Sequence, residues 1–460
     1  MSSDEVPAAR AFVGATVITL DAQRRVLRDG SVVVSGGTIL AVGPTREVLR
    51  GLPDSIEIVP CSDRVICPGF VDVHAHLGEH LVRGLVPDGE APQAWLPRWL
   101  LPVYSALRPE EEGLAAELAI AEMLLSGTTA FCEAGTLLEW GPVAEAVQRT
   151  GIRAVLGRWT WDLPEAPARM AGTADQGLRR LASMLEGVRA LGLSRLDAGV
   201  ILLGMGTASL ALLKGAAELA RDQRALLAMM HASVALQHGG RHVSHETLDR
   251  AGWLGPSTKL AHAVYVSEPE LDRLVERDVR IAHCPSAALR HAKGISRHGR
   301  VPEMLQAGLT VGLGGDSANG SNHFDMLRLM YLAATLYKDF RMDTRLLPPE
   351  TALEMATLHG ARCLGQERRI GSLETGKRAD LVIFDTRDPE WRPLLDPVQN
   401  LVLSASSRSV DSVWVEGRQV VKEGRLLTID LPRLLERVQR ASSAVLERVE
   451  LAPQPPWPIL

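Results

Sequence analysis

The stretch VDVHAHLGEH, Val71 to His80, places three histidines and two carboxylates within ten residues. In an extended strand the side chains alternate between two faces, so Asp72, His74 and His76 share one side and the residues between them form an apolar face. The H-x-H spacing is typical of a metal site, but it also fits a half-buried strand with two solvated histidines. The rest of the sequence has to decide between these interpretations.

Length and composition favour a globular protein that acts on small molecules. The chain has 460 residues, 46% of them hydrophobic, and a formal net charge of −5. This provides ample core and no overall positive field for nucleic acid or an anionic membrane. We expect a cytoplasmic protein, because no basic segment followed by an apolar one begins the chain and no apolar run reaches about 18 residues. The five cysteines are scattered and odd in number, which predicts reduced thiols.

Strand-like apolar runs alternate with helical segments through the middle of the chain. The segment PEEEGLAAELAIAEMLLSG, for example, opens with acidic residues and ends at a glycine, as a helix does. The eight runs predict a (β/α)₈ barrel over residues 68–369, with its active site at the carboxyl ends of the strands. They are FVDVHAHL, TTAFCEA, IRAVLGRW, LDAGVILLG, ALLAMMHA, KLAHAV, VRIAHCP and LTVGLGGDS.

Both ends of the chain have a different pattern. Residues 1–67 and 370–430 contain short strand-like segments separated by turn residues, which predicts one small β domain assembled from the two ends. Residues 431–460 are expected to form an amphipathic helix with a solvated charged face, followed by a proline-rich tail.

Polar side chains gather where the eight predicted strands end. Any one of them, such as His262, is more often a structural residue than a ligand, but together they predict a metal site. They are His74 and His76 on the first strand, Glu133 on the second, His231 on the fifth, His262 on the sixth, His283 on the seventh and Asp316 on the eighth.

Three imidazoles and one carboxylate suit a divalent transition metal, and we assign His74, His76, His231 and Asp316 as its ligands. Zinc is the expected ion and iron the alternative. Such an ion lowers the pKa of bound water from about 15.7 to about 7, which yields a hydroxide nucleophile at neutral pH. His262 could orient the water or polarise the electrophile, and Asp316 could accept the proton of the water.

At this point the chain resembles the amidohydrolase superfamily, in the branch of cytosine and guanine deaminases and triazine hydrolases. The resemblance covers nearly the full length and rests on seven motifs. They are PGFVDVHAHLGEHLVRG, AEMLLSGTTAF, KLAHAVYVSEPELDRL, VRIAHCPSAALRHAKG, AGLTVGLGGDSANG, ALEMATLHGARCLG and IGSLETGKRADLVIFD.

The resemblance implies a metal site, a reaction centre and an assembly. It implies that His74, His76, His231 and Asp316 bind one metal ion and that His262 and His283 line the reaction centre. It also implies that the two β segments form a composite β-sandwich and that the protein is a homodimer. Binuclear relatives carry a bridging lysine on the fourth strand, whereas LDAGVILLGMG has none and Lys214 falls in the next predicted helix. We therefore expect one divalent ion per chain.

The fifth strand departs from the pattern of this branch. Its members carry H-x-x-E there, and the glutamate moves a proton between the water and the substrate; here the stretch is HASV, and Val234 cannot carry a proton. An aromatic amine leaves poorly unless it is protonated. Either another acid has taken over, Glu79 or Glu133, or the leaving group needs less help. Glu79 matches a glutamate of some triazine hydrolases, but it could instead pair with Arg83, and Glu133 could hold a loop.

The expected reaction is hydrolytic attack on an electrophilic carbon of an N-heterocycle, cyclic amide or amidine. The alternative is a family member that has lost hydrolysis, either a non-hydrolytic metal enzyme or a metal-containing protein that binds small molecules. Asn319 and four tryptophans are candidates for the substrate pocket, although tryptophans more often pack in cores or lids. The four are Trp95, Trp99, Trp159 and Trp161. The basic segment RHAKGISRHGR could meet an anionic substrate or be a solvated loop.

Overall fold

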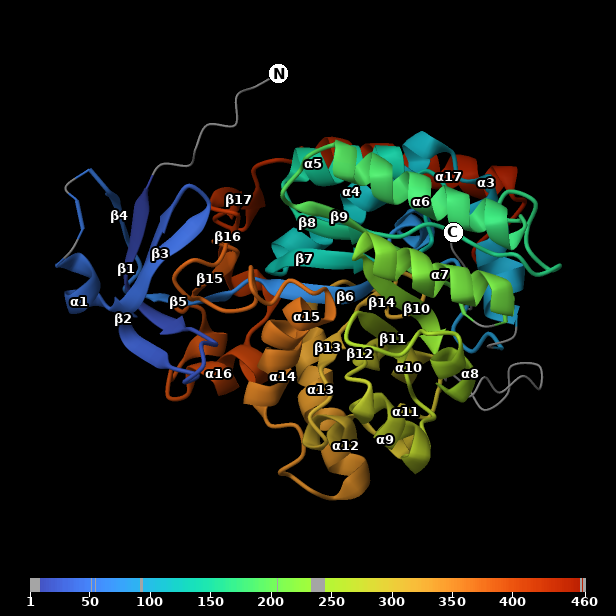
Figure 1. Cartoon of the computed structure of the whole chain (residues 1–460). Coiled ribbons are helices and arrows are strands. Elements are labelled where there is room, and N and C mark those ends of the chain that lie inside the picture. Colours follow the sequence, from blue (N-terminus) through green and yellow to red (C-terminus); the bar gives the residue numbers. More distant parts are fainter. Residues whose placement is uncertain are drawn as a thin grey trace.

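A computed structural model describes residues 9–50, 52–53, 55–91, 94–204, 206–232, 245–455 and 457. The chain forms a closed parallel sheet surrounded by helices, and a second sheet lies beside it, at the left of Figure 1. The predicted architecture of a barrel and a β-rich domain is therefore confirmed.

The barrel consists of parallel strands, in agreement with the eight predicted runs. The last run is broken into two pieces, and the first piece pairs with the preceding strand whereas the second pairs with the first strand of the barrel, which closes the sheet. In chain order the strands are β6 (Phe70–His76), β7 (Thr128–Glu133), β8 (Arg153–Leu156), β9 (Leu196–Leu202), β10 (Leu226–Ala232), β11 (Thr258–His262), β12 (Arg280–His283), β13 (Val311–Leu313) and β14 (Asp316–Ser317).

Two glycines make the break in the last strand possible. A Cβ on Gly314 would lie 2.7 Å from the Cβ of His74, and a Cβ on Gly315 would lie 2.7 Å from Oδ2 of Asp72. Only residues without a side chain can pass this close to β6. The break lets Asp316 rejoin the sheet beside Ala75.

The interior of the barrel is filled by one apolar cluster with members from every strand from β6 to β12. Val71 and Val73 belong to this cluster, whereas Ala75 packs in the larger core toward the helices. The strict alternation predicted for this strand is therefore wrong, because the pairing of β6 with β7 shifts between Asp72 and Ala75. A shift of register turns the following side chains toward the other face.

Helices connect the strands and cover the barrel. Helix α4, between β6 and β7, has Pro109 at its start and three glutamates in its first turn, as its sequence predicted. The helices are α3 (Leu101–Ala106), α4 (Pro109–Leu125), α5 (Trp140–Thr150), α6 (Ala174–Ala190), α7 (Leu210–Gln223), α8 (His245–Arg250), α9 (Glu268–Glu276), α10 (Pro285–Arg290), α11 (Ile295–His298), α12 (Val301–Gln306), α13 (Met326–Arg341), α14 (Pro349–Ala356) and α15 (Leu358–Cys363). Two short helical turns, η1 (Gly78–Val82) and η2 (Trp95–Leu100), precede α3.

The second sheet takes strands from both ends of the chain. Its order is β18-β17-β16-β15-β5-β1-β2-β3, and β4 also pairs with β1, so β5 lies between an N-terminal and a C-terminal strand. Figure 1 shows this as blue strands beside orange and red ones. The strands are β1 (Arg10–Ile18), β2 (Val26–Ser35), β3 (Thr38–Pro44), β4 (Glu57–Pro60), β5 (Arg64–Pro68), β15 (Leu381–Asp385), β16 (Val410–Val415), β17 (Arg418–Lys422) and β18 (Arg425–Leu426); the helices α1 (Thr45–Leu49) and α16 (Pro397–Gln399) flank them.

A buried ion pair joins the two sheets. Arg153 at the start of β8 donates to both carboxylate oxygens of Asp380, just before β15, at 3.0 and 3.1 Å, and both side chains are 1% exposed. Asp380 also accepts the backbone N–H of Glu416 at 2.8 Å. This two-point geometry ties the amino-terminal end of the barrel to the composite sheet.

The C-terminal helix α17 (Leu431–Arg448) packs on α4 at the top of Figure 1. Leu434 and Val445 are buried there, and Arg448 pairs with Glu111 at 2.7 Å. The amphipathic helix predicted for this segment is present. In the described part of the chain, no helix has the length and apolar character that crossing a membrane requires.

Candidate metal centre

One carboxylate lies at the centre of the polar groups at the carboxyl ends of the strands. Oδ1 of Asp316 lies 3.3 Å from Nε2 of His76 and 3.8 Å from Nε2 of His74. Its other oxygen, Oδ2, lies 3.9 Å from Nε2 of His262 and 4.0 Å from Nζ of Lys293. The structure thus brings four nitrogens from two strands and one loop around a single aspartate.

The spacing of these atoms fits a divalent ion. Candidate ligand atoms of His74, His262 and Asp316 all lie within 4.8 Å of one another. Two ligands of a tetrahedral zinc ion, each about 2.0–2.1 Å from it, lie roughly 3.3 Å apart. The observed separations of 3.3–3.9 Å therefore need only small side-chain movements.

The chemistry of the donors also fits. Nε2 of His74 and both ring nitrogens of His262 are buried and make no hydrogen bond. Burial lowers the pKa of both histidines well below the usual value, which leaves neutral imidazoles that can bind a metal. Burial alone would raise the pKa of Asp316, but the neighbouring His76, His262 and Lys293 hold it well below its usual range. His74 and His262 therefore offer neutral nitrogens beside an ionised carboxylate. Burial alone would lower the pKa of His76, but the neighbouring Asp316 raises it above its usual value.

His231 lies beside this group at the end of β10. Its ring centroid is 5.2 Å from that of His262 and 6.2 Å from that of His76. The ligand set expected from the sequence included His231 and left His262 to orient the water. The structure places both rings next to the cluster, with His262 in the tighter group of atoms.

The backbone is strained where two of these residues sit. His262 has φ +70° and Asp316 has φ +64°, and Ala263 follows with φ +45°. Residues other than glycine adopt this left-handed region at a cost of order 1–3 kcal/mol, and such residues cluster at functional sites. The two positions are the last residue of β11 and the first residue of β14.

Asp72 supports the site, a role that the sequence did not predict. Its carboxylate accepts the backbone N–H of His74 at 3.0 Å and that of Gly315 at 3.1 Å. Burial raises its pKa to about 7. Asp72 therefore connects β6, which carries His74, to Gly315 in the break between β13 and β14.

Glu79 is buried three residues beyond His76, on η1. Its Oε1 accepts the hydroxyl of Tyr104 at 3.0 Å and its Oε2 accepts the backbone N–H of Asn319 at 3.2 Å. The alternative salt bridge with Arg83 does not form, because Arg83 pairs with Glu122 instead. Burial raises the pKa of Glu79, which favours a carboxyl that keeps its proton.

Asn319 and Glu133 are both fully buried. The side-chain oxygen of Asn319 accepts the N–H of Val86 at 3.3 Å, and its Nδ2 makes no hydrogen bond. Glu133 accepts the backbone N–H groups of Gly135 at 2.6 Å and Thr136 at 3.0 Å, so its carboxylate holds its own loop. These contacts support the interpretation that Glu133 holds a loop, which the sequence left open beside a role as the replacement acid.

The candidate tryptophans occupy the loops at this end of the barrel. Trp159 packs edge-on against Tyr104 with centroids 5.4 Å apart, and Trp161 is buried in the same apolar cluster. Trp95 packs edge-on against His291 at 5.3 Å. The indole nitrogens of these three tryptophans are buried and make no hydrogen bond, whereas that of Trp99 donates to Glu90.

Two residues named from the sequence lie apart from the cluster or outside the described chain. The ring of His283 lies 6.1 Å from that of Tyr337 on α13, and its neighbour Ala282 takes the inward position on β12. Val234 falls in residues 233–244, outside the described residues.

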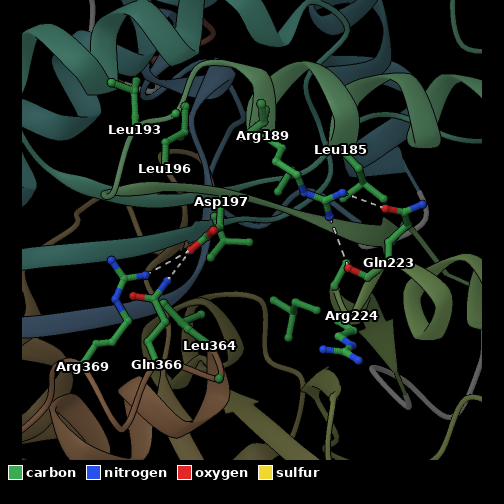
Figure 2. A pocket seen from close by; sticks show the side chains of 17 residues that line it. Leu185, Arg189, Leu193, Leu196, Asp197, Gln223, Arg224, Leu364, Gln366 and Arg369 are labelled. Carbon is green, nitrogen blue, oxygen red and sulfur yellow. Dashed lines mark hydrogen bonds and ion pairs between the residues drawn. The ribbon is translucent and has the colours of Figure 1, made fainter.

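A pocket at the opposite end of the barrel is a different feature. It encloses about 340 Å³ between α6, α7 and the starts of β9 and β10. Figure 2 shows that its polar groups pair with one another: Arg369 and Gln366 with Asp197, and Arg189 with Gln223. No candidate metal ligand lines it. In barrels of this type catalysis occurs at the carboxyl ends of the strands, where the histidines lie.

Comparisons with known proteins show which family the chain belongs to. The chain is 34% identical over 438 residues to a 5-methylthioadenosine/S-adenosylhomocysteine deaminase of Syntrophobacter fumaroxidans, covering 93% of this chain and 96% of the relative. It is 32% identical over 425 residues to a 5′-deoxyadenosine deaminase of Methanothermobacter thermautotrophicus, covering 91% and 95%. The solved structure of an adenosine deaminase of Xanthomonas campestris with bound zinc matches with a TM-score of 0.87 at 28% identity, covering 96% of this chain and 99% of that one.

An atrazine chlorohydrolase of Arthrobacter aurescens, in complex with zinc, shares the fold with a TM-score of 0.82 at 24% identity, covering 94% of this chain and 99% of that one. The family model described as "Amidohydrolase family" matches residues 65–420. The chain therefore belongs to the amidohydrolase family, whose members are metal-dependent hydrolases of C–N bonds.

Proposed function

We propose that this protein hydrolytically removes an exocyclic amino group from an N-heterocycle, and that adenosine nucleosides altered at the 5′ position are the first substrates to test. The observation that carries the proposal is the group of buried histidines around the ionised carboxylate of Asp316 at the carboxyl ends of the strands. The names of the relatives, which span nearly the whole chain, support the choice of substrates.

We propose one divalent ion per chain, with zinc as the first candidate. His74, His76 and Asp316 would hold it, with a further nitrogen from His231 or His262. A bound ion of this kind makes hydroxide available from water at neutral pH and polarises the substrate. The lack of a lysine on β9 supports a single ion, and Lys214 lies exposed on α7.

Glu79 is the proposed proton carrier. It is buried near His76, its pKa is raised, and Tyr104 and Asn319 fix both of its oxygens. A carboxyl held in this way can give a proton to the leaving nitrogen and take one from water. Trp159, Trp161 and Trp95 would cover the flat faces of the heterocycle.

A second candidate function follows from Val234, which stands where this branch carries its proton-transferring glutamate. If Glu79 does not carry the proton, the substrate should have a leaving group that departs without protonation, such as a halide or an alkoxide on a triazine ring. The relatives named as deaminases favour the first candidate.

The test is a substrate panel on the zinc-loaded protein, with ammonia release and ultraviolet spectra as readouts. We expect chelator-sensitive release of ammonia from 5-methylthioadenosine, S-adenosylhomocysteine or 5′-deoxyadenosine. Turnover only of halogenated or alkoxylated triazines would favour the second candidate. No turnover of either group would refute both.

Metal analysis of two variants tests the ligand set. His231→Ala and His262→Ala remove the two rings that compete for the remaining ligand position. The variant that loses zinc while keeping a cooperative melting transition identifies the ligand, and the other should keep zinc but lose activity. Two tightly bound ions per chain would contradict the single-ion proposal.

A further inference from the structure

The loop between α10 and α11 brings an ammonium group to the edge of the candidate metal centre. Nζ of Lys293 lies 4.0 Å from Oδ2 of Asp316, and the side chain is 16% exposed. The same oxygen lies 3.9 Å from Nε2 of His262. The sequence left open whether this basic segment meets the substrate or only solvent, and the structure turns its single lysine inward.

The backbone holds Lys293 in this position. Its N–H donates to the carbonyl of Ala288 at 2.9 Å, and its carbonyl accepts the hydroxyl of Tyr265 at 3.0 Å. The residues on either side are left-handed, with φ +48° at Ala292 and +70° at Gly294. A left-handed alanine is strained, and such strain persists only where the surroundings fix it. The lysine is therefore presented by a rigid loop.

Asp316 alone does not account for this lysine. Its carboxylate is expected to bind the metal, and a divalent cation competes with the ammonium group for the same oxygens. Within the described part of the chain, no other carboxylate lies within 4.0 Å of Nζ of Lys293. A largely buried charge is costly unless it is paired. Since the described residues offer no second carboxylate, a group from outside the chain can pair with Lys293.

We propose that Lys293 binds an anionic group of the substrate. This group is a carboxylate, or an ionised hydroxyl attached to the ring, next to the carbon that is attacked. The inference rests on the proposed hydrolysis of an N-heterocycle at this site. The short distance to Asp316 places the anion near the reacting bond and not at a distant substituent. Nε2 of His291, in the same loop, is buried and makes no hydrogen bond. The same is true of Nε1 of Trp95 on η2, whose ring packs against that of His291.

Calorimetry with a matched pair of ligands tests the proposal without requiring turnover. The pair is 4-aminopyrimidine-5-carboxylate and its 5-carboxamide, which differ in one charge beside the amino-bearing carbon. The zinc-loaded wild-type protein should bind the carboxylate about 10- to 100-fold more tightly, as expected for a hydrogen bond between charged groups. Lys293→Met, which keeps the unbranched side chain but removes its charged end, should abolish the preference, and Lys293→Arg should keep most of it.

The control is Lys214→Met, the same substitution on the exposed face of α7, which should bind like the wild type. Zinc content is measured for every variant, because a bare carboxylate can bind zinc directly. A preference that survives in zinc-loaded Lys293→Met would overturn the proposal, and so would failure of the wild type to bind the carboxylate.

A second pair places the charge far from the reacting carbon: adenosine-5′-carboxylate and adenosine-5′-carboxamide. A preference that depends on Lys293 in this pair alone would refute the placement beside the scissile bond. Ammonia release distinguishes the proposed deaminase function from the proposed anion site at Lys293. Deamination of neutral adenosines, together with equal binding of 4-aminopyrimidine-5-carboxylate by the wild type and Lys293→Met, would keep the proposed function and refute the anion site. If the protein binds the carboxylate in a way that depends on Lys293 but releases no ammonia from any substrate, the anion site is supported and the proposed function is refuted.

Discussion

Replacing Glu79 by glutamine should remove a proton carrier and leave the surroundings nearly unchanged. The glutamine oxygen can keep the N–H of Asn319, and its amide group can donate to Tyr104, whose hydroxyl can turn and accept. All partners stay paired, so the free energy of unfolding should change by less than about 1 kcal/mol. Loss of a general acid lowers kcat by about 10²- to 10⁴-fold, which is about 3–5 kcal/mol in the activation free energy.

The assay is kcat on the best substrate of the panel, with zinc content and the melting temperature measured in parallel. Burial raises the pKa of Glu79, so the wild-type rate should fall as the pH rises through that raised value, and this limb should be missing in the variant. Glu133→Gln is the control. Both oxygens of Glu133 accept backbone N–H groups, which cannot turn to accept from the new amide group, so this variant should lower the melting temperature. A zinc-loaded Glu79→Gln protein with a rate within about threefold of wild type would refute the role of Glu79 as a general acid.

Two further predictions concern stability. Arg153→Met leaves the buried carboxylate of Asp380 unpaired and should cost about 3–5 kcal/mol in denaturant unfolding, whereas Arg153→Met with Asp380→Leu should recover part of the loss; equal stability of the two variants would contradict this. Burial alone would raise the pKa of Glu122, but His80 and Arg83 lower it to about 2. Its contribution is therefore present above the unfolded value of about 4.3 and is lost as the pH falls toward 2. The free energy of unfolding of Glu122→Gln should be lower than that of the wild type at pH 7, and the difference should shrink over this pH range. A difference that stays constant would argue against the pairing.

The sequence predicted the features that follow from periodicity and missed those that depend on local backbone geometry. Apolar runs and turn residues were sufficient for the strands of the barrel and for the β domain from both ends. Of the residues predicted at the strand ends, the structure brings His74 and His262 together around Asp316, and their role stays a prediction. The orientation of His283 depends on which face of β12 it occupies. The inward turn of Lys293 depends on the left-handed backbone of Ala292, which no sequence motif indicates. The role of Val234, the domain limits at residues 67 and 370, the homodimer and the cytoplasmic location stay predictions.

The shared sheet has a consequence for how the protein is made. Strand β5 finds one neighbour, β1, early in the chain, but its other neighbour, β15, begins only at Leu381. At about 5–20 residues per second, a ribosome needs roughly 15–60 s to synthesise the segment between them. During that time β5 presents an open edge of backbone hydrogen-bonding groups, the kind of edge that recruits strands of other chains. Overproduction in a host with few chaperones should therefore yield aggregates nucleated by the first five strands, even when the finished enzyme is stable.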